Sequence, residues 1–203
     1  MNIRFVGDSA LLLEVGDSRT AQQWREAIHR QSFPGILELV PGLDTLLVEF
    51  DPLRFDAVKF TRRLPKFMES FGFSSEAREH RIEVRYQGED LEDVARMTGL
   101  DVVEVVRYHA AATYTVAFLG FAPGFPYLTG LDLKLRVPRL KSPRTKVLAG
   151  AVAIADEFSG IYPQATPGGW RILGYTNTVL FDVSRPAPSL LMPGDKVHFR
   201  PVP

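Results

Sequence analysis

Aromatic rings, glycines and prolines are concentrated in one short stretch, GFAPGFPYL, from Gly120 to Leu128. The two prolines and two glycines exclude a helix or a central strand, so the stretch is expected to be a loop. An extended backbone would place Phe121, Phe125 and Tyr127 on one side. Two interpretations stay open: a rigid aromatic plug for a barrel mouth, or the preformed wall of a small-molecule pocket.

A second stretch, TPGGWRILGYT from Thr166 to Thr176, combines adjacent glycines with a tryptophan and an arginine. Gly168 and Gly169 leave the backbone free to aim several N–H groups at one anion. Trp170 offers a rigid stacking face, and Arg171 a bidentate partner for a carboxylate or phosphate. The alternative is a hairpin turn with a core tryptophan.

Positive charge is concentrated between Leu133 and Ala155, where the chain has no acidic residue. The basic residues of this segment are Lys134, Arg136, Arg139, Lys141, Arg144 and Lys146. Arg139 and Arg144 each follow a proline, which reduces the freedom that an arginine loses when it binds an anion. A solvated basic loop is the alternative.

His109 shares a predicted helix face with Val102, Val105 and Val106. It is either a core residue with a satisfied hydrogen bond or a general acid or base near neutral pH. The other histidines, His29, His80 and His198, do not have metal-ligand spacing with it, so we expect no metal site.

The bulk composition excludes several classes of protein. The 203 residues carry a formal net charge of zero and include no cysteine, which argues against nucleic acid, anionic membranes, disulfides and thiolate sites. No apolar run approaches the roughly 20 residues that span a bilayer. Phosphate-loop, G-x-S-x-G and H-E-x-x-H motifs are absent, so a self-contained kinase or hydrolase is not visible. We expect a soluble cytoplasmic protein.

The first 79 residues predict a small α/β domain with the order ββαββα. The predicted strands and helices are Ile3–Val6, Ala10–Val15, Thr20–His29, Leu37–Val40, Thr45–Phe50 and a helix from Asp56, its N-cap, to about Phe71. The polar segment Ser74–Glu79 is the expected boundary, which divides the chain into domains 1–79 and 80–203.

The second domain starts with a predicted strand, Arg81–Tyr86, and two helices, Leu91–Met97 and Asp101 to about Ala112, the latter with Asp101 and Glu104 as a capping box. Eleven of the 15 prolines then fall between Pro123 and Pro203. The short apolar segments between them are Val147–Ala155, Arg171–Leu173, Val179–Val183 and Val197–Phe199. Short strands between such turns favour a β-barrel or sandwich.

These segments together resemble the KipI/PxpB family, also called allophanate hydrolase subunit 1. The segments that carry the resemblance are His109, Tyr114–Phe118, GFAPGFPYL, SPRTKVLAGAVAIA, SGIYPQATPGGWRILGYT, Leu180–Asp182 and LLMPGDKVHFRP. The match is dense from about Arg81 onward and looser before it, where GDSALLLE and PGLDTLLVEFDP carry it.

The resemblance implies an α+β N-terminal domain followed by a mainly-β, cyclophilin-like barrel. It implies a KipA/PxpC-like partner and, with a PxpA-like subunit, an ATP-dependent 5-oxoprolinase that opens the lactam of 5-oxoproline to glutamate. Two alternatives remain: a regulatory inhibitor of a sensor histidine kinase, and half of a urea- or allophanate-type carboxyltransferase. Which of the proteins in such a complex binds ATP is left open.

The family pattern also indicates site residues. His109 and Arg144 are the expected catalytic residues, as proton donor or substrate orienter and as charge stabiliser. The expected substrate-binding residues are Phe121, Pro123, Gly124, Phe125, Gln164, Pro167, Gly168, Gly169 and Trp170. The chain departs from the pattern at Ala151, which lacks a hydroxyl, and at Tyr175, where the family has an arginine; both bear on which substrate is bound.

Overall fold

The structure is a computed structural model that describes residues 2–69 and 77–203. The chain divides into two units, Met1–Glu76 and Ala77–Pro203. The boundary segment expected from the sequence, Ser74–Glu79, lies partly outside the described residues. No helix in the described ranges is long and apolar enough to cross a membrane.

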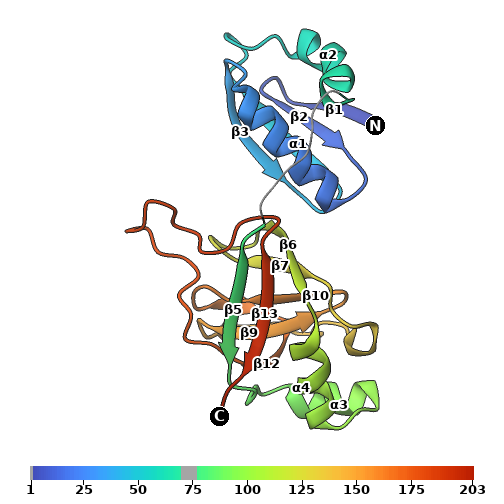
Figure 1. Ribbon diagram of the computed structural model, residues 1–203, viewed down its shortest axis with the longest axis vertical. Coiled ribbons are helices and arrows are strands. Elements are labelled where there is room, and N and C mark those ends of the chain that lie inside the picture. Colours follow the sequence, from blue (N-terminus) through green and yellow to red (C-terminus); the bar gives the residue numbers. More distant parts are fainter. Residues whose placement is uncertain (1, 70–76) are drawn as a thin grey trace. The chain divides into compact units, whose positions relative to one another are not determined.

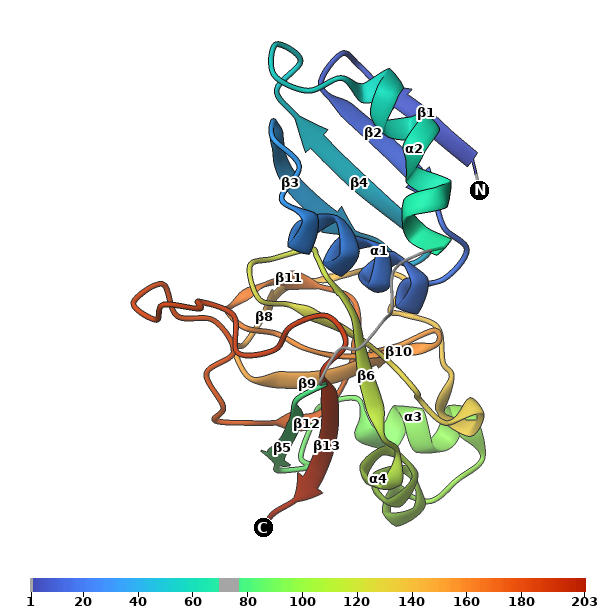
Figure 2. The ribbon, with the colours of Figure 1, turned by 45° about the horizontal axis from the view of Figure 1, so that its top comes forward.

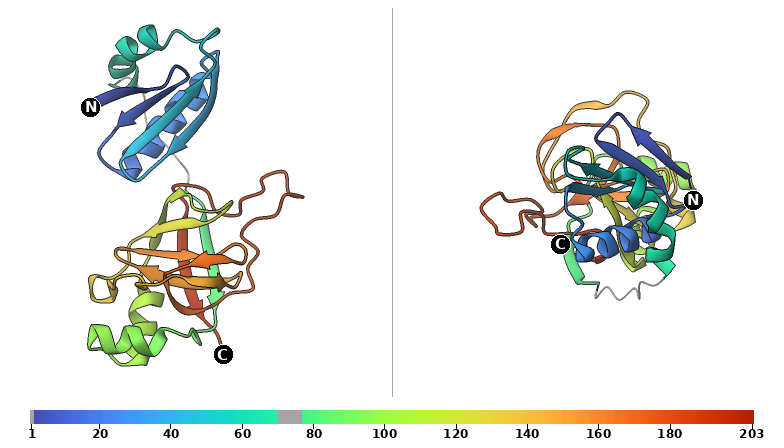
Figure 3. Two further views of the ribbon diagram at one scale, coloured as in Figure 1. Left: turned by 180° about the vertical axis from the view of Figure 1, so that it is seen from behind. Right: turned by 90° about the horizontal axis from the view of Figure 1, so that it is seen from above.

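The first unit is one antiparallel sheet with two helices on one of its faces (Figures 2 and 3). Its elements are β1 (Asn2–Val6), β2 (Ala10–Glu14), α1 (Ser18–Gln31), β3 (Ile36–Pro41), β4 (Thr45–Phe50) and α2 (Ala57–Glu69), and the sheet order is β1-β2-β4-β3. The order of elements is the expected ββαββα. The Asp56 carboxylate accepts a hydrogen bond from the Lys59 amide at 2.8 Å, as an N-cap should. The expected end of this helix, Phe71, lies outside the described residues.

The second unit is a nearly closed barrel built from a seven-stranded sheet (Figure 1). Its strands are β5 (Glu79–Val84), β6 (Tyr114–Leu119), β7 (Pro126–Thr129), β9 (Ala151–Ala155), β10 (Phe158–Ile161), β12 (Arg171–Tyr175) and β13 (Lys196–Pro201), in the order β12-β9-β10-β7-β6-β13-β5. Among the strand pairs of the described residues, β13–β5 alone is parallel. Arg85 and Tyr175 exchange two backbone hydrogen bonds of 2.9 Å, which join the two outer strands.

Shorter elements complete this unit. They are α3 (Leu91–Thr98), α4 (Val102–Ala111), the 3-10 turn η1 (Leu133–Leu135) and a two-stranded ribbon of β8 (Arg144–Val147) and β11 (Thr166–Gly168). The predicted capping box of α4 is present: Asp101 accepts from the Glu104 amide, and Glu104 accepts from the Asp101 amide.

Two predicted strands are wrong. The segment Val147–Ala155 is not one strand, because the chain turns between β8 and β9 at Gly150, whose φ is +82°. A side chain at Gly150 would collide with the Thr176 carbonyl oxygen, so the turn needs glycine. The segment Val179–Val183 belongs to the excursion between β12 and β13, where pairing is limited to the bridge Phe181–Ser189.

The barrel sheet has a hydrophobic cluster on each face. Along β9, Val152 and Ile154 belong to the main core, whereas Ala151 and Ala153 belong to a smaller cluster with Phe125. Alternate residues of a strand point to opposite faces. The smaller cluster therefore lies on the side of the sheet away from the main core. Of the predicted site residues, Phe125 belongs to it and Trp170 packs against it.

Candidate functional site

A layer of aromatic rings covers the smaller cluster. Tyr127 is at its centre: its ring stacks on Phe118 at 4.3 Å between centroids and meets Trp170 edge-on at 5.4 Å. Phe158 approaches Tyr127 at 5.6 Å. All four of these side chains are only partly buried, so the layer presents ring surface to solvent, as a site for a flat apolar ligand requires.

The loop before β7 contains one buried ring and one exposed ring. Phe125 is 1% exposed and packs edge-on against Tyr162, Tyr127 and Trp170 at 5.1–5.4 Å. Phe121 is 61% exposed and rests edge-on against Phe125 at 5.4 Å. Phe125 is therefore a packing residue of the smaller cluster, whereas the ring of Phe121 is open to solvent.

Backbone geometry holds Phe121 outward. Its φ is +67°, a left-handed conformation that is uncommon for a bulky residue and that costs energy. Gly124, at φ +76°, has no room for a side chain, because a Cβ would lie 2.7 Å from the Cβ of Phe181. Pro123, between them, is exposed. The loop is thus tightly specified although its tip is open to solvent.

The turn that carries Trp170 is fixed by close contacts. A side chain at Gly168 would collide with the Tyr162 hydroxyl, whereas Gly169 has ordinary space around it. The Gly169 carbonyl accepts a hydrogen bond of 2.7 Å from the Leu140 amide. The acid-free segment, residues 133–155, therefore lies against this turn at Leu140. Gln164, which precedes β11, and Pro167, which lies in it, are exposed. The predicted residues Phe121 to Phe125 and Gly168 to Trp170 are therefore brought together.

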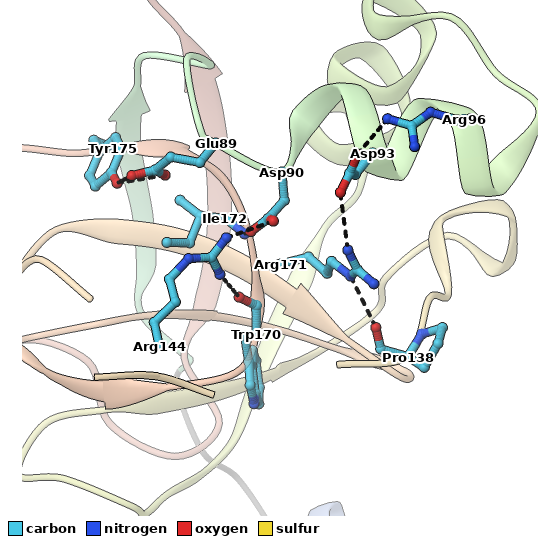
Figure 4. A network of polar contacts seen from close by, with 10 residues as sticks. All are labelled: Glu89, Asp90, Asp93, Arg96, Pro138, Arg144, Trp170, Arg171, Ile172 and Tyr175. Atoms are coloured by element: carbon cyan, nitrogen blue, oxygen red, sulfur yellow. Dashed lines mark hydrogen bonds and ion pairs between the residues drawn. The ribbon is translucent and has the colours of Figure 1, made fainter. Parts of the chain in front are cut away.

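Arg144 lies beside this cluster, but its charge is already paired (Figure 4). Its guanidinium donates to Asp90 Oδ1 at 2.7 Å and approaches the Trp170 carbonyl at 3.5 Å. The Arg144 side chain is 28% exposed and that of Asp90 only 4%. The second Asp90 oxygen accepts from the Ile172 amide at 2.7 Å. Both carboxylate oxygens of Asp90 thus accept hydrogen bonds that link the start of α3 to the barrel.

Two further contacts join the α3 region to β12 (Figure 4). The Tyr175 hydroxyl donates to the Glu89 carboxylate at 2.7 Å, and Arg171 lies 3.5 Å from Asp93. Burial and the Glu89 hydrogen bond raise the pKa of Tyr175 to about 12. Tyr175 thus contacts Glu89 as a neutral hydrogen-bond donor.

His109 lies on the other face of the sheet, in the main core. It is completely buried and stacks on Phe199 at 4.7 Å. Ser159 Oγ donates to the Ala153 carbonyl, so it accepts from His109 Nε2–H at 2.9 Å, and Tyr86 donates to Nδ1 at 2.8 Å. Burial lowers the pKa of His109 to about 3. The structure therefore does not bring His109 to the aromatic layer.

Sequence reasoning missed the partners of the two predicted catalytic residues. Asp90 looked like a helix-capping acid, yet its side chain pairs with Arg144, 54 positions away. Ser159 and Tyr86 gave no local signal for their contacts with His109, which span 50 and 23 positions. In the described ranges, no group of three or more His, Cys, Asp or Glu side chains is placed to hold a metal ion.

Comparisons with known proteins place the chain in a family. Residues 1–191 match the family model described as carboxyltransferase domain, subdomain C and D. The chain is 40% identical to the B subunit of 5-oxoprolinase from Escherichia coli O157:H7, over 97% of this chain and 94% of that protein. It is 35% identical to the Bacillus subtilis protein of the same name, over 98% and 93%.

Solved structures agree with the fold. The crystal structure of TTHA0988 has 38% identity and a TM-score of 0.86; this chain is covered completely but spans only 40% of that chain. The Kluyveromyces lactis urea carboxylase has 23% identity and a TM-score of 0.75, with 99% of this chain and 22% of that chain covered, a likeness of fold alone. From its match to the family model and its curated relatives, the chain belongs to the KipI/PxpB family.

Proposed function

We propose that the chain is the B subunit of an ATP-dependent 5-oxoprolinase, which opens the lactam of 5-oxoproline to L-glutamate together with PxpA- and PxpC-like partners. The observation that carries the proposal is the identity of 35–40%, over nearly the whole chain, to three curated relatives that are each named as this component of 5-oxoprolinase. The partly exposed aromatic layer supports it, because 5-oxoproline is a small and nearly flat ring.

The proposed reaction explains why anion binding and a flat surface belong together. Transfer of the γ-phosphoryl group of ATP to the lactam oxygen would activate the ring carbon. Water then adds to that carbon, the ring C–N bond breaks with a proton taken up by nitrogen, and inorganic phosphate leaves. The products are glutamate, ADP and phosphate. The negative charge on substrate and nucleotide calls for fixed hydrogen-bond donors.

In this proposal the chain contributes substrate binding. Phe121, Tyr127 and Trp170 contact the ring, with Pro123, Gln164 and Pro167 at the exposed edge. Phe125, Gly124, Gly168 and Gly169 shape the surface beneath. Arg144 is placed beside Trp170 by Asp90, whereas His109 stabilises the barrel from the opposite face of the sheet.

A companion protein completes the site. The aromatic layer is open to solvent, and this chain spans only 40% of its structural relative TTHA0988. We propose that a PxpC-like partner covers the layer and that ATP binds in the assembled complex. The chain's own sequence has no phosphate loop, so no ATP-binding residue is assigned to it.

Co-expression of the chain with PxpA- and PxpC-like subunits tests the proposal. We expect glutamate and ADP to form in equal amounts from 5-oxoproline and ATP. A Trp170→Leu chain should assemble with its partners but turn over 5-oxoproline at least about tenfold less efficiently, since one face of the ring loses its contact. No turnover with three folded, associated wild-type subunits would refute the assignment.

A carboxyltransferase half remains the second candidate. It is supported by 25% identity to a urea amidolyase of Saccharomyces cerevisiae, of which this chain spans 13%. That role would require biotin-dependent carboxylation of an amide. We expect no such carboxylation from the co-expressed complex of the chain with PxpA- and PxpC-like subunits. Inhibition of a sensor histidine kinase is the third; unchanged autophosphorylation of candidate kinases in the presence of the chain would exclude it.

A further inference from the structure

Two arginines of the acid-free segment follow a proline, but they differ in how their charges are balanced. Arg144 is paired with Asp90, and the negative charge of the Glu89 carboxylate also favours the charged form of Arg144. Arg139 is exposed and has no ion pair or side-chain hydrogen bond within the described residues. Of these two arginines in the described residues, Arg139 is therefore the one whose positive charge is available to a ligand.

The backbone of Arg139 is held on both sides by the turn that carries Trp170. The Pro138 carbonyl accepts a hydrogen bond of 3.3 Å from Arg171 Nε (Figure 4). The Leu140 amide donates to the Gly169 carbonyl at 2.7 Å. Because Arg171 is itself anchored by Asp93 at 3.5 Å, the backbone from Pro138 to Leu140 is fixed. Less conformational freedom is then lost when Arg139 binds an anion.

Arg139 lies near the aromatic layer, because the amide of the next residue, Leu140, is hydrogen-bonded to Gly169, which precedes Trp170. Burial raises the pKa of the Tyr127 hydroxyl, and the nearby positive charge of Arg139 partly opposes that effect. Tyr127 is the central ring of the layer, stacked on Phe118 and adjacent to Trp170. An unpaired guanidinium beside a flat apolar surface suits a ligand with a planar ring and a carboxylate.

We propose that Arg139, and not Arg144, binds the carboxylate of the substrate while the lactam ring lies on the aromatic layer. The inference rests on the proposed function for the identity of the substrate. Arg139 would then determine specificity for carboxylated lactams over neutral ones, because a bidentate guanidinium–carboxylate pair depends on the carboxylate alone.

The assembled complex provides the first test. Arg139→Gln should raise the KM for 5-oxoproline at least about tenfold and change kcat less than about threefold, since the lost contact is made equally in ground and transition states. Arg139→Lys should fall between, because lysine keeps the charge but not the fork. Lys141→Gln, which removes an exposed charge two positions away, is the control and should leave KM unchanged.

A second test does not depend on turnover. In a Trp24→Phe chain, Trp170 is the remaining tryptophan, and its fluorescence can be titrated with 5-oxoproline and with neutral 2-pyrrolidinone. We expect Arg139→Gln to weaken 5-oxoproline binding about tenfold or more and to leave 2-pyrrolidinone binding unchanged.

The two tests separate the inference from the proposed function. An active complex whose KM is the same with Arg139→Gln overturns the inference and leaves the 5-oxoprolinase role intact. An inactive wild-type complex, together with Arg139-dependent binding of 5-oxoproline by the chain, supports the inference and counts against the role. Equal binding of 5-oxoproline by the wild-type and Arg139→Gln chains overturns the inference in either case.

Discussion

The two faces of the barrel sheet use polar groups in opposite ways. On the inner face, Tyr86, His109 and Ser159 form a chain of hydrogen bonds that ends on the Ala153 carbonyl, and His109 is fully buried. On the outer face, partly exposed rings lie beside Arg139, whose charge is unpaired in the described structure. A histidine and serine 2.9 Å apart look like catalytic partners, but here both ring nitrogens and the Ser159 hydroxyl hydrogen are already used within the core.

The polar groups of the two faces thus differ in whether their hydrogen bonds are already made, and not in residue type. A buried network with every group satisfied makes the fold rigid and specific. An exposed cation next to an apolar surface adds little to stability and keeps its hydrogen-bonding capacity for a ligand. Mutations on the inner face should therefore change stability, and mutations on the outer face should change binding.

The largest expected effect is on the inner face. His109→Ala removes a fully buried ring that stacks on Phe199, and it takes one hydrogen-bond partner from each of the Tyr86 and Ser159 hydroxyls. We expect unfolding free energy to fall by about 3–4 kcal/mol, measured by urea denaturation with Trp170 fluorescence in the Trp24→Phe chain. A loss below about 1 kcal/mol would show that the network is not structural.

A smaller loss of stability is expected from breaking the Asp90–Arg144 ion pair. Asp90→Asn removes one partner of a largely buried ion pair and should cost about 2–3 kcal/mol. The matched control is Asp93→Asn three positions along, whose carboxylate is 43% exposed and pairs with Arg171 at 3.5 Å. It should cost less than about 1 kcal/mol. Equal losses for the two variants would contradict the paired role assigned to Arg144.

The pH dependence of stability should also come from the inner face. Because burial lowers the pKa of folded His109 to about 3, from an unfolded value near 6.5, the unfolded chain takes up the proton first. The contribution of neutral His109 to the unfolding free energy is complete above pH about 6.5 and declines as the pH falls toward about 3. The decline is about 2 kcal/mol between pH about 7.5 and about 5. His109→Gln should flatten this part of the profile, and an unchanged slope would assign it to other groups.

The smallest effect on stability is expected at Phe121. Phe121→Ala should change the unfolding free energy by about 0.5 kcal/mol or less, because the ring is mostly exposed. Phe121→Gly should be no less stable than Phe121→Ala, since glycine tolerates the φ of +67°. In the assembled complex, both variants should lower kcat/KM for 5-oxoproline. Normal activity of both would exclude Phe121 from the site.

Local patterns predicted most of the helices and strands and the loop around Gly124. The capping box at Asp101 and Glu104, the N-cap at Asp56 and the stiff loop around Gly124 depend on residues close in sequence, and each is present. His109 was correctly placed on the apolar face of α4, where Val105 is also buried. Helical spacing could not show which side of the barrel sheet that face packs against.

The errors come from contacts that are distant in sequence. The turn at Gly150 depends on the Thr176 carbonyl, and the apolar segment around Phe181 packs against Gly124 instead of joining the sheet. Arg144 was expected to face an external anion because its own counter-ion, Asp90, is 54 positions away. Such pairings follow from the order of the strands, which periodicity alone does not contain.

The parallel pairing of β5 with β13 has a consequence for how this unit is made in the cell. Glu79 pairs with Lys196, 117 positions later, so the sheet lacks one of its strands until residues 196–201 have left the ribosome. Pairing over such a separation is slow, and the waiting strands expose apolar surface. The Met1–Glu76 unit, whose four described strands all lie between residues 2 and 50, has these strands early in synthesis. Translation speed and chaperone access late in synthesis should therefore affect the yield of the barrel more than that of the first unit.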